Sequence, residues 1–157
     1  MSRLGELTAK VDAFFARTEA RHGRDMECAS GCSDCCHVRL TITGVEADAI
    51  RALVGDRRLV ANTDPTRCAA LDAAGRCTIY EARPLVCRSH GVPIRMRVNS
   101  LPVVQSCFRN FTRGEPDADC VLDQTTLSAL VLAVDRDAGH DGTRIDLADL
   151  VAELAGD

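Results

Sequence analysis

The sequence contains no tryptophan, and aromatic residues make up only 3% of it. Aromatic side chains bury large areas in protein cores, so their scarcity excludes an interior built mainly on aromatic packing. Leu, Val, Ile and Ala must therefore form the core of this 157-residue chain. We expect such a core to benefit from an added tether, such as a bound metal.

Lysine is also scarce, since Lys10 is the only one and the positive charge is almost all arginine, and acidic residues outnumber basic ones to give a formal net charge of −4. Nucleic-acid binding needs a basic face, so we expect no nucleic-acid partner. No stretch reaches the roughly 20 apolar residues of a membrane span. The charged segment 1–24 also lacks the apolar run of a secretion signal. We therefore expect a cytoplasmic protein with no membrane partner.

Cysteine, in contrast, is abundant: the chain has nine, and eight of them form two groups. These eight are Cys28, Cys32, Cys35 and Cys36, followed by Cys68, Cys77, Cys87 and Cys107. A reducing compartment disfavours disulfides, and an odd number does not suit a disulfide scaffold. We therefore predict that the eight grouped thiols bind metal. Cys120 lies outside both groups, and we expect it to be a small buried apolar residue.

The spacing of the first group is typical of metal ligands. Gaps of three and two residues separate Cys28, Cys32 and Cys35, so a loop can direct their thiolates towards one point. The adjacent Cys35 and Cys36 would point to opposite sides of an extended segment. The eight thiols can therefore form two four-thiolate sites, or one site with spare thiols beside it. A single catalytic cysteine is disfavoured, since nothing distinguishes one of the nine.

The sequence predicts a mainly α fold with short β segments, organised as one small domain, 1–157, around a multi-cysteine metal site. The cysteine core at 28–111 would lie between an N-terminal helix and C-terminal helices. Apolar residues at helical spacing predict a helix over 3–22. The apolar run within 125–139 predicts another.

Local signals mark helix ends and short excursions. Thr43 and Glu46 form a capping-box pattern at the start of a helix that Gly55 would end. Asp146 is the expected N-cap of the last helix. The cysteines at 68 and 77 flank a turn sequence that predicts a hairpin-like excursion.

The second group adds a specific motif to the first. C-x3-C-x2-CC is followed by C-x8-C-x-IY-x2-RP-x2-CR and by a late cysteine before Asn-Phe. This pattern resembles the YkgJ-type cysteine-cluster proteins, also called the CxxCxxCC family, over residues 28–111. The non-cysteine residues that carry the resemblance are Ile79, Tyr80, Arg83, Pro84, Arg88, Asn110 and Phe111. The resemblance implies a zinc- or iron-chelating domain, and a related domain occurs in flagellin lysine methylases, where an iron–sulfur cluster is implicated.

The identity of the metal stays open between zinc, iron and an iron–sulfur cluster, because all-thiolate sites suit each of them. The irregular spacing favours iron, since zinc ribbons use two CxxC pairs and this chain has one. A four-thiolate centre carries negative charge that needs support. We expect Arg83 and Arg88 to supply it beside the cofactor. His37 and His90 are further candidate ligands.

Three functions fit these observations. The first is a metal- or cluster-binding protein whose centre staples the core or transfers metal or electrons. The second is an iron-dependent redox or modification enzyme, with an exposed cysteine or His90 at an open ligand position. The third is a zinc-stapled interaction module with 126–134 as its partner-facing helix. No catalytic residue is predicted; the expected partner is a metal ion or cluster, and a protein partner stays open.

Overall fold

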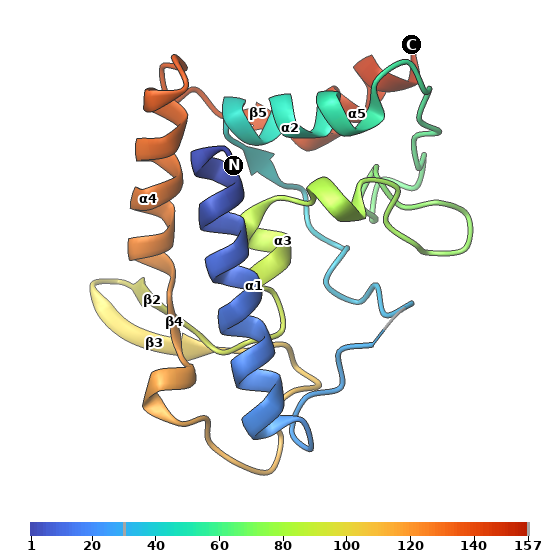
Figure 1. Ribbon diagram of the computed structural model, residues 1–157. Coiled ribbons are helices and arrows are strands. Elements are labelled where there is room, and N and C mark those ends of the chain that lie inside the picture. The colour runs from blue at the N-terminus through green and yellow to red at the C-terminus, as the bar shows by residue number, and fades with distance from the viewer. Residues whose placement is uncertain (30, 157) are drawn as a thin grey trace. The chain divides into compact units, whose positions relative to one another are not determined.

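The computed structural model describes residues 1–29 and 31–156 (Figure 1). The elements in chain order are α1 (Arg3–His22), β1 (Thr41–Ile42), α2 (Gly44–Val54), η1 (Tyr80–Ala82), α3 (Leu85–Ser89), β2 (Ile94–Val98), β3 (Leu101–Gln105), η2 (Ala118–Cys120), β4 (Leu122–Asp123), α4 (Gln124–Asp137), β5 (Ile145–Asp146) and α5 (Leu147–Ala155). Helices predominate and the strands are short, which confirms the expected mainly α class. The chain forms two compact units: a first unit of Met1–Ala29 and Leu85–Val131, and a second unit of Ser30–Pro84 and Leu132–Asp157.

The first unit is built on α1, which packs against α3 (Figure 1). The helix has the bounds that the apolar periodicity predicts, and it buries Leu7 and Val11. β2 pairs antiparallel with β3 and parallel with β4. Asn99 and Ser100 form the tight turn of this hairpin with positive φ angles of 49° and 66°. That backbone conformation suits the right-handed twist of the two strands.

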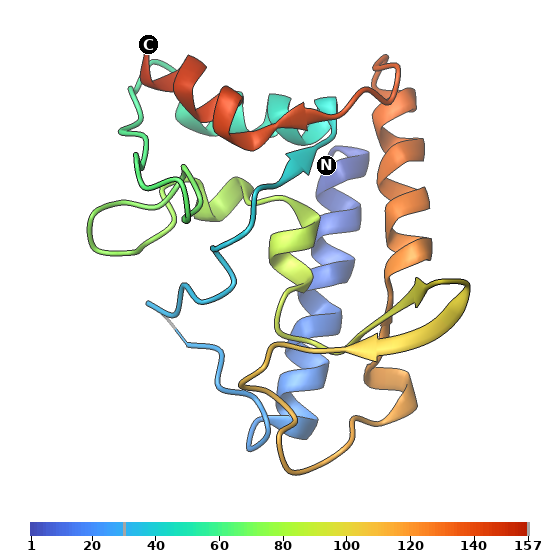
Figure 2. The same cartoon turned by 180° about the vertical axis from the view of Figure 1, so that it is seen from behind.

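The second unit holds an aliphatic core between α2 and α5, which lie side by side in both views (Figure 2). β1 and β5 pair antiparallel. β1 immediately precedes α2 and β5 immediately precedes α5, so this pairing joins the starts of the two helices. The buried core residues are Ile42, Ala47, Ile50, Val54, Ala70, Ile79, Leu147, Leu150 and Val151. None of them is aromatic, as the composition of the chain predicts.

Side-chain caps fix the starts of both core helices in the second unit. The Glu46 carboxylate accepts hydrogen bonds from the backbone N–H and the hydroxyl of Thr43, which confirms the capping box. Gly55 ends α2, also as predicted. The Asp146 carboxylate accepts the Ala148 N–H at 2.9 Å and so caps α5. In the described part of the chain, no helix is long and apolar enough to cross a membrane.

Candidate metal centre

In the second unit, the backbone joins the two cysteine groups of the sequence. This unit holds five of the eight grouped cysteines: Cys32, Cys35, Cys36, Cys68 and Cys77. The Cys68 N–H donates to the Cys36 carbonyl at 2.7 Å. Further along the chain, Cys77 forms an antiparallel β-bridge with Leu71. This bridge closes a short loop and confirms the predicted hairpin-like excursion.

The Cys77 thiol interacts electrostatically with the thiols of Cys68 and Cys35. Burial raises its pKa above the ordinary value, and the charges of Cys68 and Cys35 raise it further. The Ile79 N–H and the Arg83 guanidinium act in the opposite direction, because they stabilise the thiolate. A cluster of thiols with a nearby cation is the environment that thiolate–metal bonding requires.

The predicted supporting arginines lie in different units. Arg83 stacks over the Tyr80 ring, 3.9 Å from the ring centroid, in the second unit. Its charge acts on the Cys77 thiol. Arg88 belongs to the first unit, where its Nη1 contacts the Asp12 carboxylate at 2.9 Å. Arg83 therefore has the environment expected of a thiolate partner, and the same role for Arg88 stays a prediction.

In the first unit, Cys28 is surrounded by groups that fit its sulfur. The Asn110 side-chain amide donates to Cys28 Sγ at 3.3 Å and to the Gly91 carbonyl at 2.7 Å. The Asn110 oxygen in turn accepts the Glu27 N–H at 2.8 Å. Asn110 is buried, so these three bonds fix the direction of its amide. The amide N–H is thus a fixed donor to a thiol or thiolate at Cys28.

Gly91 leaves the space that the Cys28 sulfur occupies. A Cβ built on Gly91 would lie 2.6 Å from Cys28 Sγ, and the glycine has a φ of +109°. Both the contact and the backbone conformation favour glycine here. Residue spacing predicts no role for Gly91 or for the amide of Asn110. The Asn-Phe of the motif is the one sequence signal that points to Asn110.

The remaining candidate ligands have different surroundings. Cys87 lies on α3, and the Cys107 carbonyl accepts the Asn110 N–H at 2.8 Å; both belong to the first unit. His37 Nδ1 lies 3.1 Å from the Thr66 carbonyl oxygen. His90 is exposed. Cys120 is fully buried, as predicted.

The cysteine pattern and the surroundings of the thiols agree with the comparison against known families. A domain described as "CxxCxxCC: Putative zinc- or iron-chelating domain" matches residues 27–107, about half of the chain. The chain belongs to the CxxCxxCC family. The resemblance to the CxxCxxCC family drawn from the sequence is thereby confirmed, and the description of the family supports a metal-binding role. No curated protein and no solved structure matches the chain.

Proposed function

We propose that this CxxCxxCC protein binds zinc or iron, with an iron–sulfur cluster as one form of the iron centre, through thiolates of its eight grouped cysteines. The observation that carries the proposal is the shared neighbourhood of Cys35, Cys68 and Cys77 in the second unit. Thiols from both sequence groups interact there although more than 30 residues separate them. Metal ligation is the usual reason for such a gathering of thiols.

The donor set fits the proposed metal. No cysteine in the described part of the chain forms a disulfide, so the eight grouped cysteines keep sulfur atoms that can bind metal. In the second unit the Arg83 charge and the Ile79 N–H favour the thiolate at Cys77. In the first unit the Asn110 amide donates a hydrogen bond to the Cys28 sulfur at 3.3 Å. Zinc bound to these thiolates would tie loops together, whereas an iron–sulfur centre would add electron transfer.

The test is to purify the protein without oxygen, remove loosely bound metal with a chelator, and measure zinc, iron and acid-labile sulfide. We expect zinc or iron in stoichiometric amount after the chelator wash. Brown protein with sulfide would identify an iron–sulfur centre, and colourless zinc protein would identify a zinc staple. A chain without retained metal, whose grouped thiols all alkylate freely while it stays folded, would contradict the proposal.

Single substitutions connect the retained metal to the cysteine set. Cys77→Ser removes one thiol of the second-unit neighbourhood, so we expect it to lose retained metal. Ala74→Ser is the control, because Ala74 is an exposed residue of the same loop and carries no thiol. We expect the control to keep the chelator-resistant metal at the wild-type level. Equal loss in both variants would indicate a general folding defect.

A further inference from the structure

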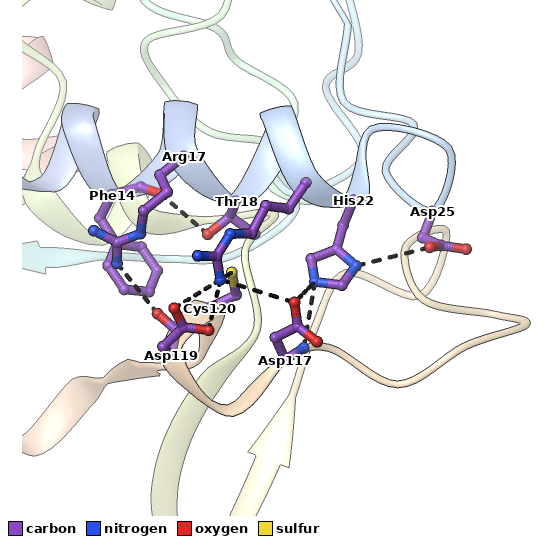
Figure 3. Close-up of polar contacts among 9 residues, drawn as sticks. Phe14, Arg17, Thr18, His22, Asp25, Asp117, Asp119 and Cys120 are labelled. Carbon is purple, nitrogen blue, oxygen red and sulfur yellow. Dashed lines mark hydrogen bonds and ion pairs between the residues drawn. The ribbon is translucent and has the colours of Figure 1, made fainter.

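A second group of metal-binding side chains lies in the first unit, outside the cysteine segment. His22, Asp117 and Cys120 place one ligand atom each within 4.8 Å of one another (Figure 3). His22 Nε2 is 3.3 Å from Asp117 Oδ2. Two donors bound to one tetrahedral zinc ion at about 2.0 Å are separated by a similar distance. The three donors are therefore close to a binding geometry without an ion.

Local structure explains how these residues come together. Asp117 precedes η2 and Cys120 ends it, so the two are three residues apart on a 3₁₀ turn. Side chains at i and i+3 of such a turn lie on the same side. His22 is the last residue of α1, which contacts η2. The group therefore forms where the end of one helix meets one short turn.

The His22 ring is held in the orientation that a metal ligand needs. Its Nδ1 lies 4.0 Å from the Asp25 carboxylate, and its Nε2 accepts the Asp117 N–H at 3.3 Å (Figure 3). An ion bound at Nε2 would replace the hydrogen bond from the Asp117 N–H, while Nδ1 would still face Asp25. The Phe111 ring packs edge-on against the imidazole, 5.4 Å between centroids. Ligating histidines typically have a carboxylate or carbonyl partner at the other ring nitrogen.

Charge at the group is also suited to a divalent ion. Arg21 Nη1 lies 3.9 Å from Cys120 Sγ and 3.8 Å from Asp117 Oδ2, so one positive charge already contacts two of the three donors. One thiolate and one carboxylate would neutralise a divalent cation. Arg21 would keep its hydrogen bonds to Asp119, at 2.7 and 2.8 Å, when an ion takes its place beside the sulfur.

We propose that His22, Asp117 and Cys120 form a second metal site, selective for a borderline divalent cation of the Zn²⁺ type. Mixed nitrogen, oxygen and sulfur donors favour this class, and three protein ligands leave the fourth position for water. Cys120 is fully buried at the base, whereas the Asp117 side chain is 59% exposed. An ion can therefore enter from the Asp117 side. The site is distinct from the cysteine centre proposed above.

The experiment counts metal in two stages. Metal retained after the chelator wash is measured first, and the same protein is then titrated with Co²⁺, using the thiolate-to-cobalt charge-transfer absorption as the signal. Wild-type protein should take up one further equivalent, which added Zn²⁺ displaces. His22→Gln and Cys120→Ser should lose this equivalent. Asp25→Asn should weaken it by about 10- to 100-fold, as for other partners of ligating histidines.

Asp117→Asn provides the decisive comparison, because Asp117 is exposed and its replacement should leave folding intact. Glu115→Gln is the matched control, an exposed carboxylate two residues away in the same loop. We expect Asp117→Asn to lose the added equivalent and Glu115→Gln to keep it. Equal uptake by both variants, or no added equivalent in the wild type, would overturn the proposal. The metal counted in the first stage tests the cysteine centre independently.

Discussion

At the scale of single residues, neighbouring side chains set the surroundings of the sulfur atoms at Cys28 and Cys77. At Cys28, the fixed Asn110 amide donates to the sulfur, and Gly91 leaves room for it. At Cys77, burial opposes the thiolate while Arg83 favours it. The balance at each thiol therefore depends on one or two neighbours, and single substitutions can test it.

The first prediction concerns Gly91→Ala. Alanine at a φ of +109° is strained by about 1–2 kcal/mol, and its Cβ would also press on Cys28 Sγ at 2.6 Å. Gly142→Ala is the control, because Gly142 has a φ of +85° but no atom within 4 Å of the built Cβ. Denaturant unfolding should show the larger loss of stability in Gly91→Ala, and metal analysis should show a loss of retained metal in that variant alone. Equal behaviour of the two variants would refute the role given to Gly91.

The second prediction concerns the pH dependence of Cys77. Its folded-state pKa is raised, mainly by burial. Below the ordinary thiol pKa, the thiol is protonated in both the folded and the unfolded chain, so its contribution to stability is fully present. As pH rises through the folded-state pKa, the thiol ionises in the folded state as well, and that contribution is lost. The metal-free protein should therefore become less stable in alkaline solution.

Alkylation followed by mass spectrometry measures the ionisation of the Cys77 thiol directly. In metal-free protein, the alkylation rate at Cys77 should reach half its maximum at a higher pH than for an ordinary thiol, because burial raises the pKa of Cys77. Cys32, which is exposed, provides the reference for the activity of the reagent in the same sample. A midpoint at Cys77 in or below the ordinary thiol range would contradict the prediction.

At the scale of the elements, side chains at the helix starts define where the core helices of the second unit begin. Asp146 caps α5 and also pairs with Arg39, whose Nε lies 2.7 Å from its carboxylate. Together these interactions lower the pKa of Asp146, with the Arg39 hydrogen bond as the largest cause. Arg39 is exposed, so its ion pair adds little stability. The cap should therefore dominate the energetic role of Asp146.

The third prediction separates the cap from the ion pair. Asp146→Ala loses both and should destabilise the protein by about 1 kcal/mol in denaturant unfolding. Asp146→Asn keeps a capping oxygen but loses the charge, so it should recover most of that stability. Asp149→Ala, an exposed acid in the first turn of the same helix, should have a smaller effect. If Asp146→Asn is as destabilised as Asp146→Ala, the ion pair rather than the cap is the main contribution.

The sequence predicts these elements well where the signals are local. Periodicity and caps identify α1, α2 and α5, because each depends on residues within a few positions. Local patterns do not reveal the β2–β3 hairpin, since the turn at Asn99 and Ser100 lacks glycine and its positive φ angles are not evident from the residue types. The parallel pairing of β2 with β4 depends on contacts that are distant in sequence. Local patterns do not reveal such contacts.

The candidate site also combines features that the sequence predicts with contacts that only the fold reveals. The spacing identifies the eight cysteines, and the motif identifies the family. The neighbourhood of Cys35, Cys68 and Cys77 depends on a long-range backbone bond from Cys68 to Cys36, which no spacing rule reveals. His22 and Cys120 are nearly 100 residues apart, so their proximity also emerges only from the fold.

At the scale of the whole molecule, the chain has little aromatic area, and the core of its second unit is wholly aliphatic. The grouped cysteines occur in both compact units, five in the second and Cys28, Cys87 and Cys107 in the first. Metal bound to these thiols would replace part of the stability that aromatic packing supplies elsewhere. Stability and metal content should therefore change together.

The last prediction is that stripping the metal lowers the stability of the whole chain. A ligand at about 1,000 times its dissociation constant stabilises a folded protein by about 4 kcal/mol. In a chain of this size, 1 kcal/mol corresponds to about 2–4 °C, so the loss should be on the order of 10 °C in melting temperature. Hydrogen exchange should locate the effect, because the Cys68 and Thr78 amides bond to Cys36 and Ala70 within the cysteine loops. These amides should lose protection on stripping and regain it when the metal is restored. An unchanged melting temperature with unchanged protection would show that the metal does not stabilise the fold.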